Sequence, residues 1–264
     1  MIDWKDKFPK GNIYFQTDNG ILYCGRAEKI LPTLPDEVID CVVTSPPYNL
    51  GIKYGVYKDE LPYEEYLSWC KEWGNELYRI LKPDGRFALN HYLSCGKSGF
   101  RFAPLMDLNW IFQKIGFKHH GLAIWWDTTL SKRTAWGSWL SARAPYLNSP
   151  FEGVLIMFKN QWRRFRKGKN AIDKNLFMEI ASGIWKIMPE KTRIHPAPFP
   201  ENLVEYILRF FTYENDLIID PFIGSGTTAV VCEKLNRKWI GIELDKKYCE
   251  IAKKRILNLK RGLF

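Results

Sequence analysis

Two short motifs combine residue types that could do chemistry on an amino group. The first is Ser45-Pro46-Pro47-Tyr48, which follows a run of apolar residues. The Ser45 hydroxyl and the Pro46 carbonyl can both accept hydrogen bonds, and the proline pair stiffens the turn that carries them. Two acceptors aimed at an amine on a planar ring favour a pyramidal nitrogen with a free lone pair. Tyr48 offers a flat face on which such a ring can stack.

The second motif is a glycine-rich turn, Asp220-Pro221-Phe222-Ile223-Gly224-Ser225-Gly226-Thr227-Thr228. Its two glycines let the backbone approach a ligand closely. Glu243 ends the next apolar run, 19 residues after Gly224, where an acidic side chain can bind ribose hydroxyls. The spacing is neither G-x-G-x-x-G nor a P-loop, and Asp220 suits a ligand with positive charge. Each motif also has an interpretation without a functional role. The glycine-rich segment could be an ordinary tight turn, and the Ser45 segment could be a proline-rich turn that ends a strand.

The pattern of apolar residues places both motifs at the ends of strands. It predicts a hairpin around Asn19-Gly20, strands at 38–44, 86–92, 118–126, 151–158, 216–220 and 238–242, and helices at 27–34, 63–81, 104–115, 200–212, 227–235 and 246–257. Strands alternating with helices predict a Rossmann-like α/β fold, a mostly parallel twisted sheet of about seven to eight strands with helices on both faces. Ligands bind beyond the carboxyl ends of such strands, so both motifs are expected to meet there.

Composition limits the class of protein. A chain of 264 residues fits one large domain, or one with an insertion, at roughly 150 residues per domain. Hydrophobic residues are 46% and charged residues 26%, which excludes a disordered or collagen-like chain. The net charge of 39 − 29 = +10 favours a polyanionic partner, with nucleic acid first and a membrane surface second.

Other sequence features narrow the setting. No apolar run approaches the ~20 residues of a membrane helix, and the first residues lack the apolar core of a signal peptide. The six cysteines form no CxxC pair and no His/Cys cluster, so no metal site is expected. Reduced thiols fit a cytoplasmic protein.

Together the motifs resemble the S-adenosylmethionine-dependent DNA amino-methyltransferases. Thr44-Ser45-Pro46-Pro47-Tyr48-Asn49 precedes the Asp220–Thr227 motif, which is the order of their permuted β class. The segment His195-Pro196-Ala197-Pro198-Phe199-Pro200 resembles the one that helps to close the cofactor pocket in that family. Leu81–Gly85 and Glu152–Val154 resemble later strands of the catalytic half. The resemblance covers residues 20–258.

The resemblance implies direct transfer of a methyl group from S-adenosylmethionine to the exocyclic nitrogen of a base flipped out of duplex DNA. It assigns catalysis to Ser45, Pro46, Pro47 and Tyr48. It assigns cofactor binding to Asp220, Phe222, Gly224, Ser225, Gly226, Thr227, Thr228, Glu243, His195 and Pro196.

Two positions bear on the substrate and the cofactor. In the family, Ser at the first position of the tetrapeptide goes mostly with cytosine N4, whereas Asp goes mostly with adenine N6, which stays the alternative here. Gly25-Arg26 stands where the family often has Gly-Asp. Cytosine C5 methylation is excluded, because it needs a cysteine after proline and no cysteine here follows one.

We expect a single methyltransferase domain over residues 1–264. It comprises a catalytic half (20–126), a mobile DNA-facing loop (127–150), a small target-recognition insertion (159–190) and a cofactor half (195–258). The candidate DNA contacts are the basic residues Lys132, Arg133, Arg143, Arg163, Arg164, Arg166, Lys167 and Lys169. A solvated basic loop is the alternative for residues 159–169.

The resemblance also implies a biological setting. The protein would be the modification part of a restriction–modification system, a monomer or homodimer without the nuclease as a stable subunit. Two other classes of function stay open: a DNA-binding module with a vestigial cofactor fold, and a methyltransferase for a small amine, RNA or protein. Uptake of the cofactor separates the enzyme from the binding module.

Overall fold

The structure is a computed structural model that describes residues 3–51, 53–54, 57–95, 101–126, 138, 140–145, 147, 151–189 and 200–260. The strands in this part of the chain are β1 (Ile13–Gln16), β2 (Gly20–Cys24), β3 (Ile39–Thr44), β4 (Lys53–Tyr54), β5 (Tyr57–Lys58), β6 (Leu81–Tyr92), β7 (Lys118–Trp126), β8 (Phe151–Phe158), β9 (Ile184–Lys186), β10 (Leu217–Asp220) and β11 (Lys238–Glu243). The helices are η1 (Trp4–Lys7), α1 (Ala27–Ile30), η2 (Leu31–Thr33), α2 (Tyr63–Ile80), α3 (Pro104–Ile115), α4 (Lys174–Ala181), α5 (Glu201–Phe211), α6 (Thr227–Lys234) and α7 (Lys246–Lys260).

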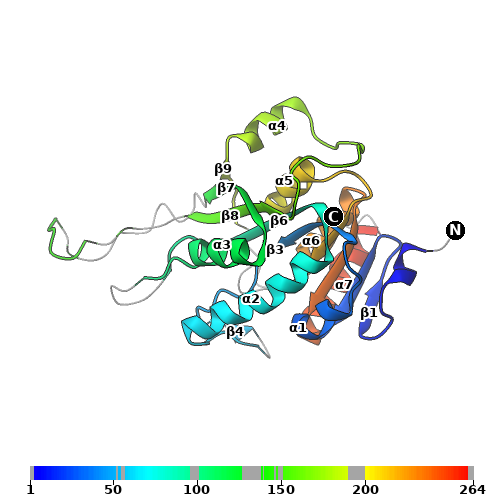
Figure 1. Cartoon of the computed structure of the whole chain (residues 1–264), viewed down its shortest axis with the longest axis horizontal. Coiled ribbons are helices and arrows are strands. Elements are labelled where there is room, and N and C mark those ends of the chain that lie inside the picture. Colours follow the sequence, from blue (N-terminus) through cyan, green and yellow to red (C-terminus); the bar gives the residue numbers. More distant parts are fainter. Residues whose placement is uncertain are drawn as a thin grey trace.

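Within the described residues, nine strands form one sheet in the order β1-β2-β11-β10-β3-β6-β8-β7-β9 (Figure 1). Strands β2, β11, β10, β3 and β6 pair in parallel. Strand β8 runs antiparallel to its neighbours β6 and β7. The predicted α/β architecture is confirmed, with nine strands in place of seven or eight because the hairpin strand β1 and the short edge strand β9 both join the sheet.

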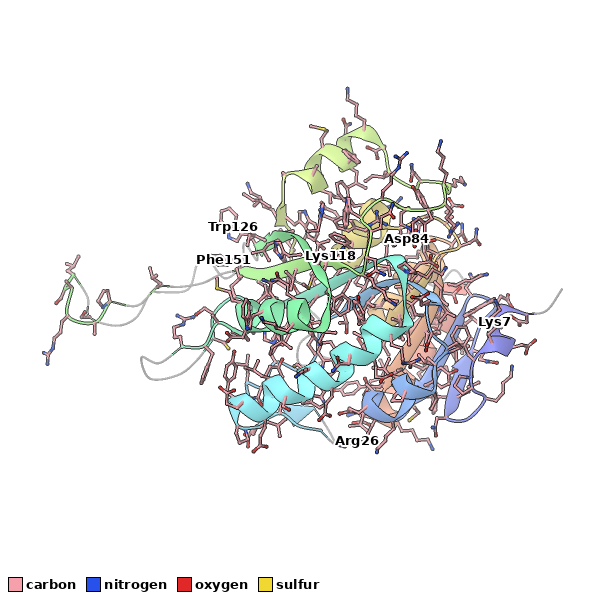
Figure 2. The ribbon with its side chains drawn as sticks, in the orientation of Figure 1. Lys7, Arg26, Asp84, Lys118, Trp126 and Phe151 are labelled. Atoms are coloured by element: carbon pink, nitrogen blue, oxygen red, sulfur yellow. The ribbon has the colours of Figure 1, made fainter. Side chains whose placement is uncertain are left out.

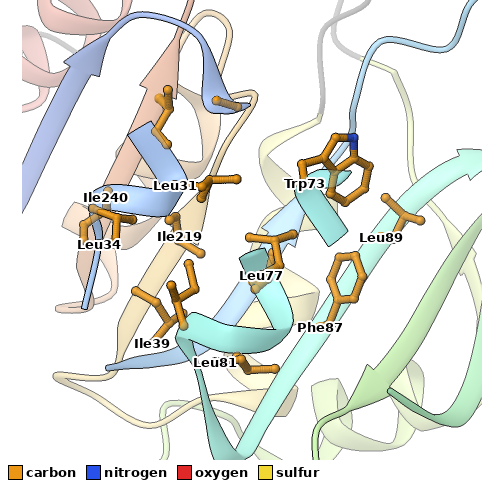
Figure 3. Packing of buried hydrophobic residues seen from close by; sticks show 14 of the residues in the cluster. Leu31, Leu34, Ile39, Trp73, Leu77, Leu81, Phe87, Leu89, Ile219 and Ile240 are labelled. Carbon is orange, nitrogen blue, oxygen red and sulfur yellow. The ribbon is translucent and has the colours of Figure 1, made fainter. Parts of the chain in front are cut away.

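Helices cover both faces of the sheet. Helices α1, α2 and α3 pack into one buried apolar cluster, and α5, α6 and α7 pack into another on the opposite face (Figure 1). In α2 the buried residues Tyr66, Cys70, Trp73, Leu77 and Ile80 recur with the spacing of a single helical stripe. Figure 3 shows two of these side chains, Trp73 and Leu77, facing the sheet. Burial of this stripe holds the helix on the sheet.

Several elements differ from the sequence prediction. The helix predicted over 63–81 ends at Ile80, and β6 begins at once at Leu81, where its pairing with β3 is irregular before Arg86. Within the predicted insertion 159–190, α4 forms a helix of eight residues and β9 pairs with β7 as the edge of the main sheet. Strand β9 has only three residues, and it forms because it pairs with β7. A run this short has too weak a local sequence pattern to be predicted.

The direction of the strands defines two edges of the sheet. The carboxyl edge holds the ends of β3, β6, β10 and β11 together with the start of the antiparallel β8, whereas the end of β8 lies at the amino edge. In Figure 2, Trp126 and Phe151 mark the carboxyl edge, and Lys118 and Asp84 lie toward the amino edge. No helix in the described part of the chain has the length and apolarity to cross a bilayer.

Candidate active site

The two motifs meet at the carboxyl edge. Strands β3 and β10 pair in parallel through Cys41 and Ile218. At their ends, the Thr44 Oγ1 hydroxyl donates a hydrogen bond of 2.8 Å to the Asp220 carboxylate. The expected convergence of Ser45-Pro46-Pro47-Tyr48 with the glycine-rich turn is therefore confirmed.

Asp220 is buried at the centre of this junction, with 3% of its surface exposed. Its carboxylate accepts from Thr44, from the Thr228 Oγ1 hydroxyl at 2.6 Å and from the Phe222 backbone amide at 3.1 Å. Burial raises the pKa of Asp220 to about 6, against these three hydrogen bonds. The side chain thus joins β3, the turn and the start of α6.

The turn depends on its two glycines. Gly224 has φ 53° and Gly226 has φ 86°, a left-handed region that other residues rarely adopt. A Cβ atom on Gly226 would also lie 2.7 Å from the Cβ of Ala252 in α7. Gly226 therefore fits both the turn and the close approach of α7.

Glu243 contacts this turn from the end of β11. Its carboxylate accepts from the Gly224 amide at 2.9 Å and from the Asp245 amide at 2.7 Å. Burial raises the pKa of Glu243 to about 7, despite these backbone hydrogen bonds. The sequence predicted an acidic group beside the turn, and the structure brings Glu243 there.

The other cofactor candidates on the turn have protein partners. The Ser225 and Thr227 hydroxyls each accept from Arg255 at 3.0 Å, and Arg255 is held by Glu201 at 2.9 Å. The Phe222 ring lies 5.4 Å from that of Trp69 in α2. His195 and Pro196 lie outside the described residues.

The catalytic turn is packed from behind. Tyr48 is 8% exposed, and its ring lies 4.2 Å from the His91 ring. The Tyr66 hydroxyl donates to the Pro47 carbonyl at 3.0 Å and lies 2.8 Å from His91 Nε2. Burial lowers the pKa of His91 to about 3, so the ring is neutral. His91 is therefore a core histidine.

Sequence reasoning missed two polar residues of the site. Asn90 in β6 and Glu152 in β8 both bond to the Tyr48 hydroxyl, the Asn90 amide at 2.6 Å and the Glu152 carboxylate at 2.8 Å. The Ser45 hydroxyl lies 2.7 Å from the same oxygen. An acidic residue at the start of an otherwise apolar strand was the signal available for Glu152.

Comparison of the whole chain with known protein families agrees with the features of this site. The family model of the N6 and N4 DNA methylases matches residues 39–254. The chain belongs to this family. It is 42% identical to the Type II methyltransferase M.MjaVI of Methanocaldococcus jannaschii over 61% of this chain and 82% of that protein. It is 31% identical to M.ScaI of Streptomyces caespitosus over 96% and 86% of the two chains.

Solved structures agree with the family. The PvuII DNA methyltransferase, described as cytosine-N4-specific, has a TM-score of 0.73 and 26% identity over 93% of this chain and 89% of that one. A putative DNA modification methylase from Thermus thermophilus, solved with S-adenosyl-L-methionine, has a TM-score of 0.71 and 26% identity over 90% and 93% of the two chains. S-adenosylmethionine is the cofactor of this methylase family and of the present chain.

The structure places the predicted basic segment away from the catalytic edge. Residues 159–169 follow β8 and so lie at the amino edge, about 20 Å of strand away from Ser45. Arg164 is 5% exposed and pairs with Asp40 at 2.7 Å, Asp216 at 3.1 Å and Asp84 at 3.2 Å. Its assignment as a DNA contact is wrong, because its charge is neutralised in the interior.

The neighbours of Arg164 share this edge. Arg166 also pairs with Asp216, and Lys169 pairs with Glu214 at 3.0 Å. Arg163 and Lys167 are exposed there. These four residues lie at the edge opposite to Ser45, and their assignment as DNA contacts stays a prediction.

The loop between β7 and β8 begins and ends at the catalytic edge. Trp126 ends β7 beside Phe151, which starts β8 (Figure 2). Arg143 in this loop is exposed, and residues 140–145 extend away from the sheet (Figure 1). Lys132 and Arg133 lie outside the described residues.

Proposed function

We propose that this methylase transfers the methyl group of S-adenosylmethionine to the exocyclic N4 of cytosine in duplex DNA. The observation that carries the proposal is Ser45, which directly follows Thr44, the residue that bonds to Asp220, and whose hydroxyl lies 2.7 Å from that of Tyr48. Ser at this position goes mostly with cytosine N4 in the family. The cytosine-N4 specificity of the similar PvuII enzyme supports the same base here.

The cofactor supplies a methyl group activated by the sulfonium. The chain would hold the target amine in line with that group, with the Ser45 hydroxyl and the Pro46 carbonyl accepting its two N–H bonds. This arrangement frees the nitrogen lone pair, and positioning of this kind can supply several kcal/mol of the barrier reduction, roughly 7–11 at best. Tyr48 would stack on the base with the ring face opposite to His91. The base must first leave the duplex, at a cost of a few kcal/mol.

The residues of the turn fit the charges of the cofactor. The Glu243 carboxylate, held by the Gly224 amide, would accept the ribose hydroxyls. Asp220 would act through its charge and through the turn that it orders, because hydroxyl and amide donors already bind both of its oxygens. Arg26 is exposed just after β2, and its guanidinium cannot accept a hydrogen bond from a ribose hydroxyl. Glu243 would therefore provide the acidic contact alone.

The chain would serve as the modification enzyme of a Type II restriction–modification system, as the names of its relatives suggest. Duplex DNA would lie along the carboxyl edge, with the 127–150 loop against its backbone. The partner nuclease would be a separate protein. A basic chain with net charge +10 favours such a polyanion.

Mass spectrometry of nucleosides tests the proposal directly. Duplex DNA incubated with the protein and S-adenosylmethionine should yield N4-methylcytosine. N6-methyladenine would instead identify the enzyme as an adenine methylase. Absence of both, with saturable cofactor binding, would reject DNA methylation.

The role of Ser45 is tested by replacing it. Ser45→Ala should lower the single-turnover rate about 10²-fold, because one group that positions the reacting amine is lost. Calorimetry should give an unchanged affinity for S-adenosylmethionine. An unchanged rate would refute the catalytic role of the hydroxyl.

A further inference from the structure

A hydrogen-bonded chain runs inward from Ser45 to Glu152. The Ser45 hydroxyl lies 2.7 Å from the Tyr48 hydroxyl, and the Tyr48 hydroxyl lies 2.8 Å from the Glu152 carboxylate. The Asn90 amide nitrogen is 2.6 Å from both Tyr48 and Glu152. Three elements meet here, because Glu152 at the start of β8 pairs with Tyr92 at the end of β6, next to the turn after β3.

Counting protons fixes the direction of this chain. An ionised carboxylate only accepts, and a tyrosine hydroxyl has one proton to donate. The Asn90 amide donates to both Tyr48 and Glu152. The Tyr48 hydroxyl also lies 3.3 Å from the Asn90 carbonyl oxygen, but the Glu152 carboxylate at 2.8 Å is the closer acceptor and carries a charge. The single Tyr48 proton therefore goes to Glu152, and the Tyr48 oxygen is left as an acceptor. Ser45 must then donate its own proton to Tyr48.

This direction decides what Ser45 presents to the substrate. With its proton committed to Tyr48, the Ser45 oxygen keeps lone pairs only. These can accept an N–H bond of an amino group. A Ser45 hydroxyl turned the other way would donate to the amino nitrogen and occupy the lone pair that must attack the methyl group.

We propose that Glu152 is a positioning residue whose negative charge orients the Ser45–Tyr48 chain, so that Ser45 is a hydrogen-bond acceptor toward the target amine. The inference rests on the proposed transfer to an amino group and holds for either base. Protonation of Glu152 removes the constraint, since a carboxylic acid can donate to Tyr48 and reverse the chain. Methyl transfer should then slow at acidic pH.

The groups around Glu152 agree with this role. Tyr48, from the turn after β3, binds Glu152, and the rings of Tyr92 and His91 from β6 contact Tyr48. Burial and the charge of Glu152 raise the pKa of Tyr48 well above its usual value, so it keeps its proton. Neutral His91 adds no charge that titrates in this range.

The test is the pH profile of single-turnover methyl transfer to duplex DNA between about pH 4 and 9, a range that includes the ordinary glutamate pKa of about 4.3. Saturating S-adenosylmethionine removes the titration of Glu243 from the measurement. The wild-type rate should fall on the acidic side. Glu152→Gln should be about tenfold slower at pH 8, since the charge-assisted bond is lost. It should lose the part of the acidic fall that comes from Glu152, whereas any part from Asp220, whose pKa burial raises to about 6, should remain. Its affinity for S-adenosylmethionine should stay within twofold of wild type by calorimetry, which also shows that it folds.

A double-mutant cycle separates this role from a general loss of structure. In a Tyr48→Phe background the chain is already broken, so Glu152→Gln should change the rate less than twofold there. Glu152→Asp, which keeps the charge, should retain an acidic fall and covers the case in which the amide variant does not fold. A Glu152→Gln enzyme with the wild-type rate and acidic fall, or an equal effect in both backgrounds, would overturn the inference. A wild-type protein that methylates no DNA would overturn the proposed function instead.

Discussion

Glu243 is the residue whose protonation should control cofactor binding. Burial raises the pKa of Glu243 to about 7, so the free protein holds a proton there below pH 7. A ribose hydroxyl is bound more strongly by the ionised carboxylate, so binding must release that proton. Affinity for S-adenosylmethionine should therefore fall as the pH drops from 8 to 6, by about tenfold for each pH unit below the pKa at most.

Calorimetry at pH 6.5 in two buffers of different ionisation enthalpy measures the protons released. Glu243→Gln should bind more weakly at pH 8 and show neither proton release nor pH dependence. Asp245→Asn on the same turn is the matched control and should retain both. Proton uptake by the wild type would contradict this role of Glu243.

At the scale of elements, Asp220 joins two strands that come from distant parts of the chain. Asp220→Ala leaves the Thr44 and Thr228 hydroxyls and the Phe222 amide without their acceptor. We expect the free energy of unfolding to fall by about 1–3 kcal/mol, the cost of unpaired buried polar groups. Urea denaturation measures the change, with the exposed Asp6→Ala as control.

The pH dependence of this change has a defined sign. Burial raises the pKa of Asp220 from 3.8 to about 6, so the folded state binds a proton that the unfolded state releases. The stability that this provides is fully present below pH 3.8 and is lost as the pH rises through 6. The destabilisation by Asp220→Ala should therefore be about 1 kcal/mol larger at pH 5 than at pH 8. A larger effect at pH 8 would contradict the assignment.

A cluster of buried ion pairs lies at the amino edge of the sheet. Arg164 brings one positive charge to three buried carboxylates at the starts of β3, β6 and β10. Burial and the neighbouring Asp40 raise the pKa of Asp216, against the effect of Arg164. Arg164→Leu should lower the free energy of unfolding by about 3–5 kcal/mol, because it leaves buried charges without their partner.

The next residue provides the control for this junction. Arg163→Leu changes an exposed neighbour of the same type and should alter stability by about 0.5 kcal/mol or less. Urea denaturation of both variants makes the comparison. Equal effects would show that the buried ion pairs do not stabilise the amino edge.

These elements also show what the sequence could predict. Ser45, Gly224 and Glu243 carry local signals, and because parallel strands end at one edge of a sheet, their sequence positions alone predict that they meet. Arg164 looked like its exposed neighbours, because its three partners lie 52 to 124 residues away along the chain. The direction of β8 was the missing fact, since an antiparallel strand delivers the following residues to the opposite edge.

For the whole molecule, the direction of β8 also decides where DNA can bind. The net charge of +10 attracts DNA, but the flipped base must reach Ser45 at the carboxyl edge. The loop over 127–150 leaves and re-enters the sheet at that edge. The basic segment 159–169 follows the end of β8 at the opposite edge. We therefore expect its exposed residues to add to the general field of the protein and not to contact the phosphates near the flipped base.

Two exposed arginines therefore should differ in how salt affects DNA binding. Arg143 lies in the loop of the catalytic edge and Arg163 lies at the amino edge. Each lost phosphate contact reduces the slope of log affinity against log salt by about 0.9. Arg143→Ala should reduce that slope by about one unit, whereas Arg163→Ala should leave it unchanged. Fluorescence anisotropy of a labelled duplex between 50 and 300 mM NaCl, roughly the range where such slopes are linear, measures both. A reduced slope for Arg163→Ala alone would place the DNA on the amino edge and would separate binding from the site at Ser45.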